Sequence, residues 1–396
     1  MEETSNNQKS KKMQRDLIIA IIAVIVLVLA GIFFVYILIA LLVLLFMVTI
    51  HELGHYIAAK CLRFKVKQFS IGMGPAIFSR VSKRTGEKFA IRCIPLGGFC
   101  SFEDDDEKEK KNPAAFNNQK PWKRIIVLVS GAFANIVTSI LILFLIFSIS
   151  GTFFPSVEKV FSQPAFYEAV DDEGKKITVE NKYIIPEDDL LKKGDIILEA
   201  NGVSVDTGDL SLIRELDPGE SVNLVIKRDG KTISVKAYVG IFTGNDGKAY
   251  KGLGIERGYA RFGFFETIGK TFQFTFKMAG TILTFLGRLV TGQENWAEVG
   301  GPATTVEVIS QVAQTNFRNF VYLVGLIGIN LAVFNLLPFP ALDGARIVFV
   351  VIEWIFRRPV NRNVEAMIHL VGLIVLFAFV AAVEIYHWFI APPPVP

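Results

Sequence analysis

Four long apolar stretches dominate the chain, at about residues 17–58, 125–150, 319–342 and 365–391. A membrane-spanning helix needs about 20 apolar residues, so each stretch is long enough to cross a bilayer. The first has no charged residue or histidine from Leu17 to Ile50. As one helix this run would be about 51 Å long, against a hydrocarbon core of about 30 Å. The pattern predicts a polytopic α-helical membrane protein with four spans, or five if the first run forms two spans joined near Gly31–Phe34.

Between the first two apolar stretches, β-branched and aromatic residues alternate with other residues, a pattern typical of β-strands. Residues 64–102 contain two strand-like runs, interrupted by the turn sequences Gly72-Met73-Gly74-Pro75 and Pro95-Leu96-Gly97-Gly98. We expect a β-hairpin, which could enter the membrane where protein shields its open edge or a cavity borders it. The charged run at 103–111 favours a solvated loop.

The segment 155–258 is polar and predicts a separate αβ module of ordinary domain size. Asn201-Gly202 and Asp229-Gly230 are turn dipeptides between strand-like runs, and Asp209–Leu216 is a short helix candidate. Residues 262–292 then place aromatic and aliphatic side chains at helical spacing among lysines and an arginine, which indicates an amphipathic helix at the membrane interface. A second, less apolar helix is expected over 300–316.

Composition agrees with a membrane protein. The 396 residues are 51% hydrophobic, with a mean hydropathy of +0.42, which is too apolar for an ordinary soluble chain. The expected surroundings are therefore a lipid bilayer, and the net charge of only +4 gives no indication of a nucleic-acid partner. Three cysteines, Cys61, Cys93 and Cys100, lack CxxC spacing and predict free thiols on a reducing side of the membrane.

The most unusual polar cluster is His51-Glu52-Leu53-Gly54-His55, directly after the uncharged run. Ionisable side chains at membrane depth are costly, so they indicate a functional site. Residues four apart share a helix face, so His51 and His55 can bind one metal ion, and Glu52 can act as general base on water. The pattern also occurs by chance in soluble helices, but its apolar context here favours zinc.

A catalytic zinc site usually has three protein ligands, so two histidines leave one to be found. The best candidate is Asp343, in the segment Asn335–Gly344, because the span before it would end on the same side of the membrane as the histidines. Pro338 and Pro340 break the helix and free backbone groups near the site. The alternative is that Asp343 caps a helix beginning at Ala345.

Other polar residues of the spans have less distinctive settings. Asn330 and Asn335 precede Asp343, where a buried amide either joins two helices or holds the backbone of a substrate. Structural roles near the membrane interfaces are expected for His369, His387, Glu353 and Glu384.

Basic residues mark cytoplasmic loops, and three clusters indicate the orientation. They are Arg63–Lys67, Lys120–Arg124 and Arg357–Arg362. All three agree if the His51–His55 end of its helix faces the cytoplasm, which places 155–258 and the tail 391–396 outside. The basic N-terminus, which we interpret as retained rather than as a cleaved signal peptide, is then inside only if the first run makes two spans. We therefore favour five spans.

The motifs taken together resemble the bacterial site-2 proteases, and among these the RseP/RasP-like regulator-of-sigma intramembrane zinc metalloproteases. The resemblance covers most of the chain after about residue 36. The motifs that carry it are HELGH at 51–55, FSIGMGP at 69–75, IPLGGF at 94–99, KPWKRIIVLVSGAFAN at 120–135 and NLLPFPALDG at 335–344.

The resemblance implies that His51, His55 and Asp343 bind zinc and that Glu52 is the base. Residues 64–102, with Gly72 and Gly74, would be a re-entrant β-loop that presents substrate as an added strand. Asn330, Asn335, Pro338 and Pro340 match positions linked to substrate handling. Residues 155–258 would be one PDZ-like domain. The expected substrates are single-pass membrane proteins already cut by another protease, such as anti-sigma factors, or remnant signal peptides in the bacterial plasma membrane.

Two motifs depart from the family pattern. Gly131-Ala132-Phe133-Ala134-Asn135 stands where Gly-Pro-x-x-Asn is usual, and Asp188-Asp189 precede Leu190 in the expected ligand loop of the PDZ-like domain. The second departure weakens binding of a free C-terminal carboxylate and leaves a filter against bulky external domains as an alternative.

The expected organisation has seven parts. They are 1–59 (N-terminal membrane segment), 60–122 (β-loop and charged loop), 123–151 (membrane helix), 155–258 (PDZ-like domain), 259–316 (interfacial helices), 317–357 (membrane segment with Asp343) and 363–391 (C-terminal membrane helix).

Two other functions compete with an intramembrane protease: a catalytically silent scaffold that uses the external module, and a metal transporter. The scaffold predicts that zinc is dispensable, and the transporter predicts several polar positions lining a path, of which the other spans offer few.

Overall fold

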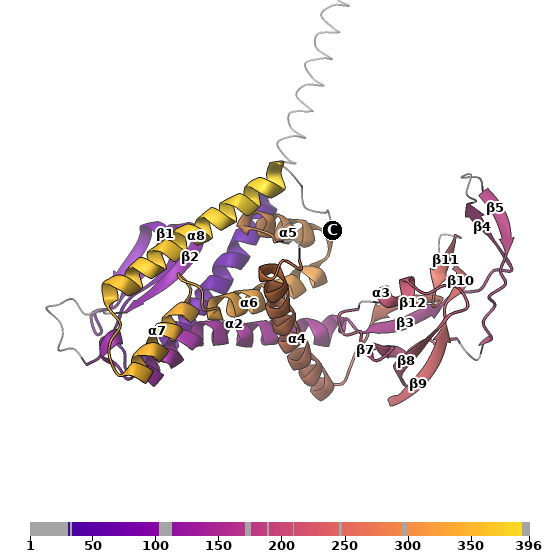
Figure 1. Cartoon of the computed structure of the whole chain (residues 1–396), viewed down its shortest axis with the longest axis horizontal. Helices are drawn as coiled ribbons and strands as arrows, with labels where there is room; N and C mark the ends of the chain where they lie inside the picture. Colours follow the sequence, from indigo (N-terminus) through magenta and orange to yellow (C-terminus); the bar gives the residue numbers. More distant parts are fainter. Residues whose placement is uncertain are drawn as a thin grey trace, which may run out of the picture. The chain divides into compact units, whose positions relative to one another are not determined.

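The computed structural model describes residues 31, 34–102, 113–170, 176–187, 190–208, 210–244, 248–294 and 299–389. The first part of the N-terminal apolar run, the charged loop at 103–111, Asp188-Asp189 and the tail from 391 lie outside the described residues. The choice between four and five spans, the solvated loop and the side of the tail therefore stay predictions. The chain divides into two compact units, Met1–Leu143 with Lys277–Pro396, and Phe144–Phe276 (Figure 1).

Four helices of the described chain are long and apolar enough to cross a membrane. They are Phe34–Cys61, α2 (Pro121–Ser150), α6 (Phe317–Leu336) and α8 (Arg362–Phe389). These helices match the four apolar stretches, so helices long enough to span a membrane are confirmed for the described part of each stretch. Shorter or more polar helical elements are η1 (Phe116–Asn118), α3 (Ser211–Arg214), α4 (Phe264–Val290), α5 (Pro302–Thr315) and α7 (Asp343–Phe356).

Small residues allow the membrane helices of the first unit to approach closely. A Cβ added to Gly54 would lie 2.3 Å from the carbonyl oxygen of Ser130 in α2. A Cβ added to Gly328 in α6 would lie 2.2 Å from Oγ of Ser139, also in α2. The helix Phe34–Cys61, which carries His51 and His55, and α6 are therefore both packed against α2.

The predicted hairpin is confirmed as β1 (Val66–Val81) paired antiparallel with β2 (Lys88–Phe102). Gly72 and Gly74 have φ angles of 79° and 82°, which only glycine adopts readily, and they bend β1 between its two halves. Because the strands are bent, the first half of β1 has a partner on each side: Ser70, for example, pairs with Phe99 on one side and with Ala90 on the other. The first half of β1 is therefore an interior strand of the folded hairpin.

The second unit is built around a sheet in the order β12–β3–β6–β8–β9, with β7 paired to β6. Its strands are β3 (Pro155–Val160), β6 (Ile196–Ala200), β7 (Val203–Ser204), β8 (Ser221–Arg228), β9 (Lys231–Tyr238) and β12 (Ile255–Tyr259). Two further hairpins pair β4 (Phe166–Val170) with β5 (Lys176–Glu180), and β10 (Gly240–Thr243) with β11 (Ala249–Gly252). Both predicted turns are confirmed, with positive φ at Asn201-Gly202 and Asp229-Gly230. The short helix predicted over Asp209–Leu216 is present as α3.

Candidate metal centre and active site

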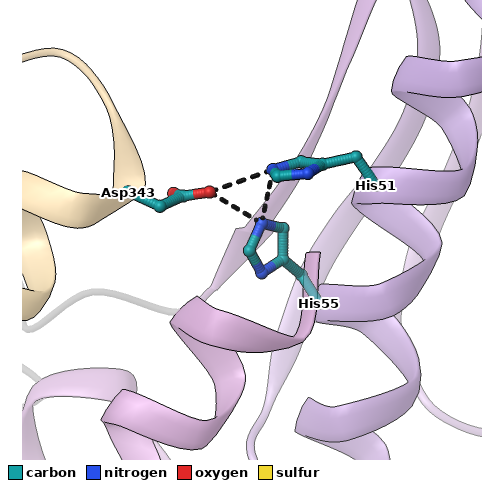
Figure 2. Close-up of side chains that lie close together, drawn as sticks. All are labelled: His51, His55 and Asp343. Carbon is teal, nitrogen blue, oxygen red and sulfur yellow. Dashed lines mark hydrogen bonds and ion pairs between the residues drawn. The ribbon is translucent and has the colours of Figure 1, made fainter. Parts of the chain in front are cut away.

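His51 and His55 lie one turn apart on the helix Phe34–Cys61, and both side chains point toward Asp343 (Figure 2). Each histidine is only 5% exposed. The two Nε2 atoms are 3.1 Å apart. The prediction that the two histidines share one helix face is therefore confirmed, and the Nε2 atoms of both rings point to one location.

Asp343 reaches this point from another element. The prolines end α6 at Leu336 as predicted, and α7 begins at Asp343 itself, so the carboxylate projects from the first helical position. Its Oδ2 lies 3.0 Å from Nε2 of His51 and 3.1 Å from Nε2 of His55. The N-cap of α7 is Leu342 and makes no side-chain cap hydrogen bond, so the alternative of Asp343 as the N-cap is wrong.

The three ligand atoms fit a zinc ion. All lie within 4.8 Å of one another, and their separations of 3.0–3.1 Å are close to the ~3.3 Å between the ligands of a tetrahedral zinc with bonds of about 2.0 Å. Two neutral imidazoles and one carboxylate, which is a common ligand set of catalytic zinc, would leave a fourth position for water.

α2 orients the ring of His55 through a hydrogen bond. Nδ1 of His55 lies 2.7 Å from the carbonyl oxygen of Val127, to which it donates. This bond puts the ring proton on Nδ1 and leaves the lone pair of Nε2 free for a metal, as in most zinc-binding histidines. Gly131, one turn further along α2, faces both rings, because an added Cβ would lie 2.4 Å from Nε2 of His55.

Glu52 is held by the hairpin. Its Oε2 accepts the backbone N–H of Cys100, in β2, at 2.8 Å. The neighbouring Gly98 also faces this side chain, since an added Cβ would lie 3.6 Å from Cγ of Glu52. The carboxylate next to the histidines is thus fixed against the part of β2 that follows the Pro95–Gly98 bend.

The other predicted site residues differ in burial and in hydrogen bonding. Asn330 is exposed, while Asn335 is half-buried and donates to the carbonyl of Leu331 in its own helix at 2.9 Å. Pro338 is exposed and Pro340 is half-buried in the loop before Asp343. Gly72 and Gly74 are in the bend of β1 described above. Among the described residues, the hydrogen bonds of His51, His55 and Asp343 involve none of these six residues.

A sequence model of peptidase family M50 matches residues 39–379, most of the chain. The chain belongs to peptidase family M50, the site-2 protease family. A Clostridium perfringens protein is 31% identical over 343 residues, covering 86% of this chain and 94% of its own. Proteins of Fusobacterium nucleatum (29% over 349 residues; 87% and 95% covered) and Clostridium acetobutylicum (28% over 349; 86% and 93%) are similar as well. All three are named "putative zinc metalloprotease".

Membership of the family makes this protein a membrane-embedded zinc metalloprotease, as the sequence predicted. Three supporting groups were missed by sequence reasoning: the Val127 carbonyl, the Cys100 amide and Gly131. Two of them are backbone groups, which carry no signal in the sequence. Gly131 belongs to the second-span motif and could have been recognised as a residue whose missing side chain makes room for the rings.

Proposed function

We propose that this M50 peptidase cleaves transmembrane segments of single-pass membrane proteins. The observation that supports this most is that His51 and His55 lie on a helix long and apolar enough to span a bilayer, and that Asp343 meets them from the end of the loop that follows a second such helix, α6. A soluble substrate would have no access to a site between such helices. The substrates would be proteins already shortened by another protease, such as anti-sigma factors, or remnant signal peptides. Proteolysis of this kind is regulated intramembrane proteolysis.

In this proposal His51, His55 and Asp343 hold zinc, and Glu52 is the general base. Zinc bound there supplies Lewis-acid chemistry, which polarises a peptide carbonyl and makes water a nucleophile near neutral pH. Glu52 accepts the proton of the attacking water at its carboxylate and later gives it to the leaving amine. The N–H of Cys100 keeps the carboxylate oriented, and Val127 keeps His55 in the tautomer that can bind metal.

The substrate would lie as an extended strand along the Gly98–Phe102 segment of β2. Two observations support this: β2 is adjacent to Glu52 through Cys100, and this segment pairs with the interior half of β1. Strand addition exposes the carbonyls that a helical substrate hides, so local unwinding precedes cleavage. The Asn330–Pro340 region would handle the substrate on the Asp343 side.

We place the protein in the bacterial plasma membrane, with the active site near the cytoplasmic side and the PDZ-like segment 155–258 outside. The three basic clusters of the sequence support this orientation, and the similar proteins are bacterial.

The decisive experiment compares the purified wild type with Glu52→Gln for zinc content and for cleavage of membrane-protein fragments. We expect zinc to be retained and cleavage to be lost in the variant, whereas Glu180→Gln, at an exposed position of β5, should leave both unchanged. Equal cleavage by wild type and Glu52→Gln would overturn the mechanism. Zinc uptake into vesicles that depends on Asp343 would instead favour a transporter.

The second unit would act as a PDZ-like binding module. A cavity of about 560 Å³ lies between α3 and β12, which is the end strand of its sheet, and Arg214, Lys251 and Arg257 are among its lining residues. An end strand beside a cavity suits a peptide added as a further strand, and the basic side chains suit a terminal carboxylate. The lining comes from Gly252–Arg257 and the α3 region, rather than from Leu190, where the sequence placed the ligand loop.

Binding to this module can be tested with paired peptides on the whole protein. A peptide with a free C-terminal carboxylate should bind more tightly than its amidated form, and Arg214→Gln should reduce that difference. If neither peptide binds, and widening the substrate's external domain slows cleavage, the module is a size filter.

A further inference from the structure

The loop that leads to Asp343 contains a strained residue. Ala341 has a φ of 82°, in the left-handed region that favours glycine. It follows Pro340 in a turn that is closed by a hydrogen bond from the N–H of Leu342 to the carbonyl of Phe339 at 3.1 Å. Within this turn the N–H of Ala341 itself is donated outside the loop. A residue in this conformation persists only where its surroundings hold it in place.

α8 supplies two contacts to this loop from one helix face. The backbone N–H of Ala341 donates to Nδ1 of His369 at 3.0 Å. Gly372, three residues further along α8, lies against Pro340, so closely that an added Cβ would be 2.1 Å from the proline Cβ. Two consecutive loop residues are thus held by two positions of one helix, just before Asp343.

The ring of His369 is itself oriented by α7. Its centroid lies 5.6 Å from that of Phe349, six residues after Asp343 in α7. Because Nδ1 accepts the hydrogen bond, the proton of the neutral ring is on Nε2. What the loop requires is therefore a hydrogen-bond acceptor at the position of Nδ1.

We propose that His369 is a positioning residue for Asp343. The inference rests on the proposed function, in which Asp343 is a zinc ligand. By accepting the Ala341 N–H, His369 fixes the chain two residues before the carboxylate and keeps Oδ2 at the point where the two histidines meet. Losing this acceptor would loosen the third ligand and leave His51 and His55 in place. Groups that orient a ligand commonly change metal affinity by about 10–100-fold.

The test is zinc affinity of the purified full-length protein, measured by competition with a chromogenic chelator, for three substitutions at one position. The amide of Asn reaches about as far as Nδ1 of histidine, whereas that of Gln reaches about as far as Nε2. We expect His369→Asn to keep near-wild-type affinity, and His369→Gln and His369→Leu each to lose roughly tenfold. His387→Leu, on the same helix but about 27 Å along it, is the matched control and should not change the affinity.

Melting temperatures of the same samples show whether each variant folds. If His369→Leu does not fold, the comparison of His369→Asn with His369→Gln still tests the proposal. Unchanged affinity in both His369→Gln and His369→Leu would overturn the proposal, and so would an equal loss in the Asn and Gln variants. Asp343→Ala is measured in parallel. If it binds zinc like the wild type, the ligand assignment of the proposed function fails; if it loses zinc while His369→Gln and His369→Leu do not, only the role of His369 fails.

Discussion

Arg124, in α2, forms a buried ion pair with Glu353, in α7. Both side chains are less than 10% exposed. The second oxygen of Glu353 accepts the backbone N–H of Val360 at 3.1 Å and lies 3.0 Å from Nη2 of Arg362. The pair connects the helix that supports His55 to the helix that begins with Asp343.

Removing one partner of this pair should be costly. Arg124→Met leaves a buried carboxylate without its main partner, and we expect a loss of roughly 3 kcal/mol in the free energy of unfolding. Replacing both residues, as Arg124→Met with Glu353→Leu, should recover most of it, because no buried charge remains. Denaturation of the protein in detergent measures both.

Arg362→Met is the control for that series. Arg362 is about 40% exposed, so removing it leaves Glu353 paired with the buried Arg124, and we expect a smaller loss of about 1 kcal/mol. A loss as large as that of Arg124→Met would show that burial is not what makes the Arg124 pair important.

Gly131→Ala should disable the metal centre. The new methyl group would lie 2.4 Å from Nε2 of His55 and 2.7 Å from Cε1 of His51, so the rings or α2 must shift and the positions of the two Nε2 atoms relative to Asp343 change. We expect zinc affinity to fall by at least about tenfold and cleavage to fall with it. Gly280→Ala in α4 is a suitable control, because nothing lies within 4 Å of its added Cβ and alanine favours helix. Normal zinc content in Gly131→Ala would contradict the described position of α2.

Zinc should stabilise the folded protein. A ligand that binds only the native state adds RT ln(1 + [L]/Kd), or about 2.7 kcal/mol at a concentration 100 times Kd. Adding zinc to chelator-treated protein should therefore raise its melting temperature, and Asp343→Ala should show little or no shift. An equal shift in both proteins would place the bound zinc elsewhere.

Tyr250 should make the second unit sensitive to alkaline pH. Burial raises the pKa of its phenol to about 12, with a smaller contribution from the charge of Glu256. The phenol in the unfolded chain ionises near 10, so the stabilisation present below pH 10 is lost as pH rises from about 10 to 12. Relative to Tyr250→Phe, the wild type should lose thermal stability over this window. A difference that does not change with pH would contradict the raised pKa.

The parts of the structure that were predictable depend on local chemistry. The histidine spacing fixes one helix face, Asn201-Gly202 and Asp229-Gly230 specify tight turns, and Pro338 ends α6. Asp343 was found because a span of known length returns the chain to the same side of the membrane. These features follow from residue type and distance along the chain alone.

The parts that were not predictable depend on contacts between distant elements. The Cys100 amide lies 48 residues from Glu52, and the Val127 carbonyl 72 residues from His55, and every non-proline residue has such groups. His369 and Glu353 were expected to have structural roles at the interfaces. Their partners, the Ala341 amide and Arg124, become visible only when α2, α7 and α8 are packed.

Arg124 has a consequence for biogenesis as well as for stability. In the orientation proposed above, it is in the unfolded chain one of the positive charges of Lys120–Arg124 that would favour retention on the cytoplasmic side during insertion. In the folded protein the same charge is neutralised by Glu353 and no longer faces solvent. In that orientation, one residue would act first on the insertion of the chain and later on the packing of α2 against α7. Arg124→Lys separates the two stages, because it keeps the charge that directs insertion and loses the planar geometry of the guanidinium.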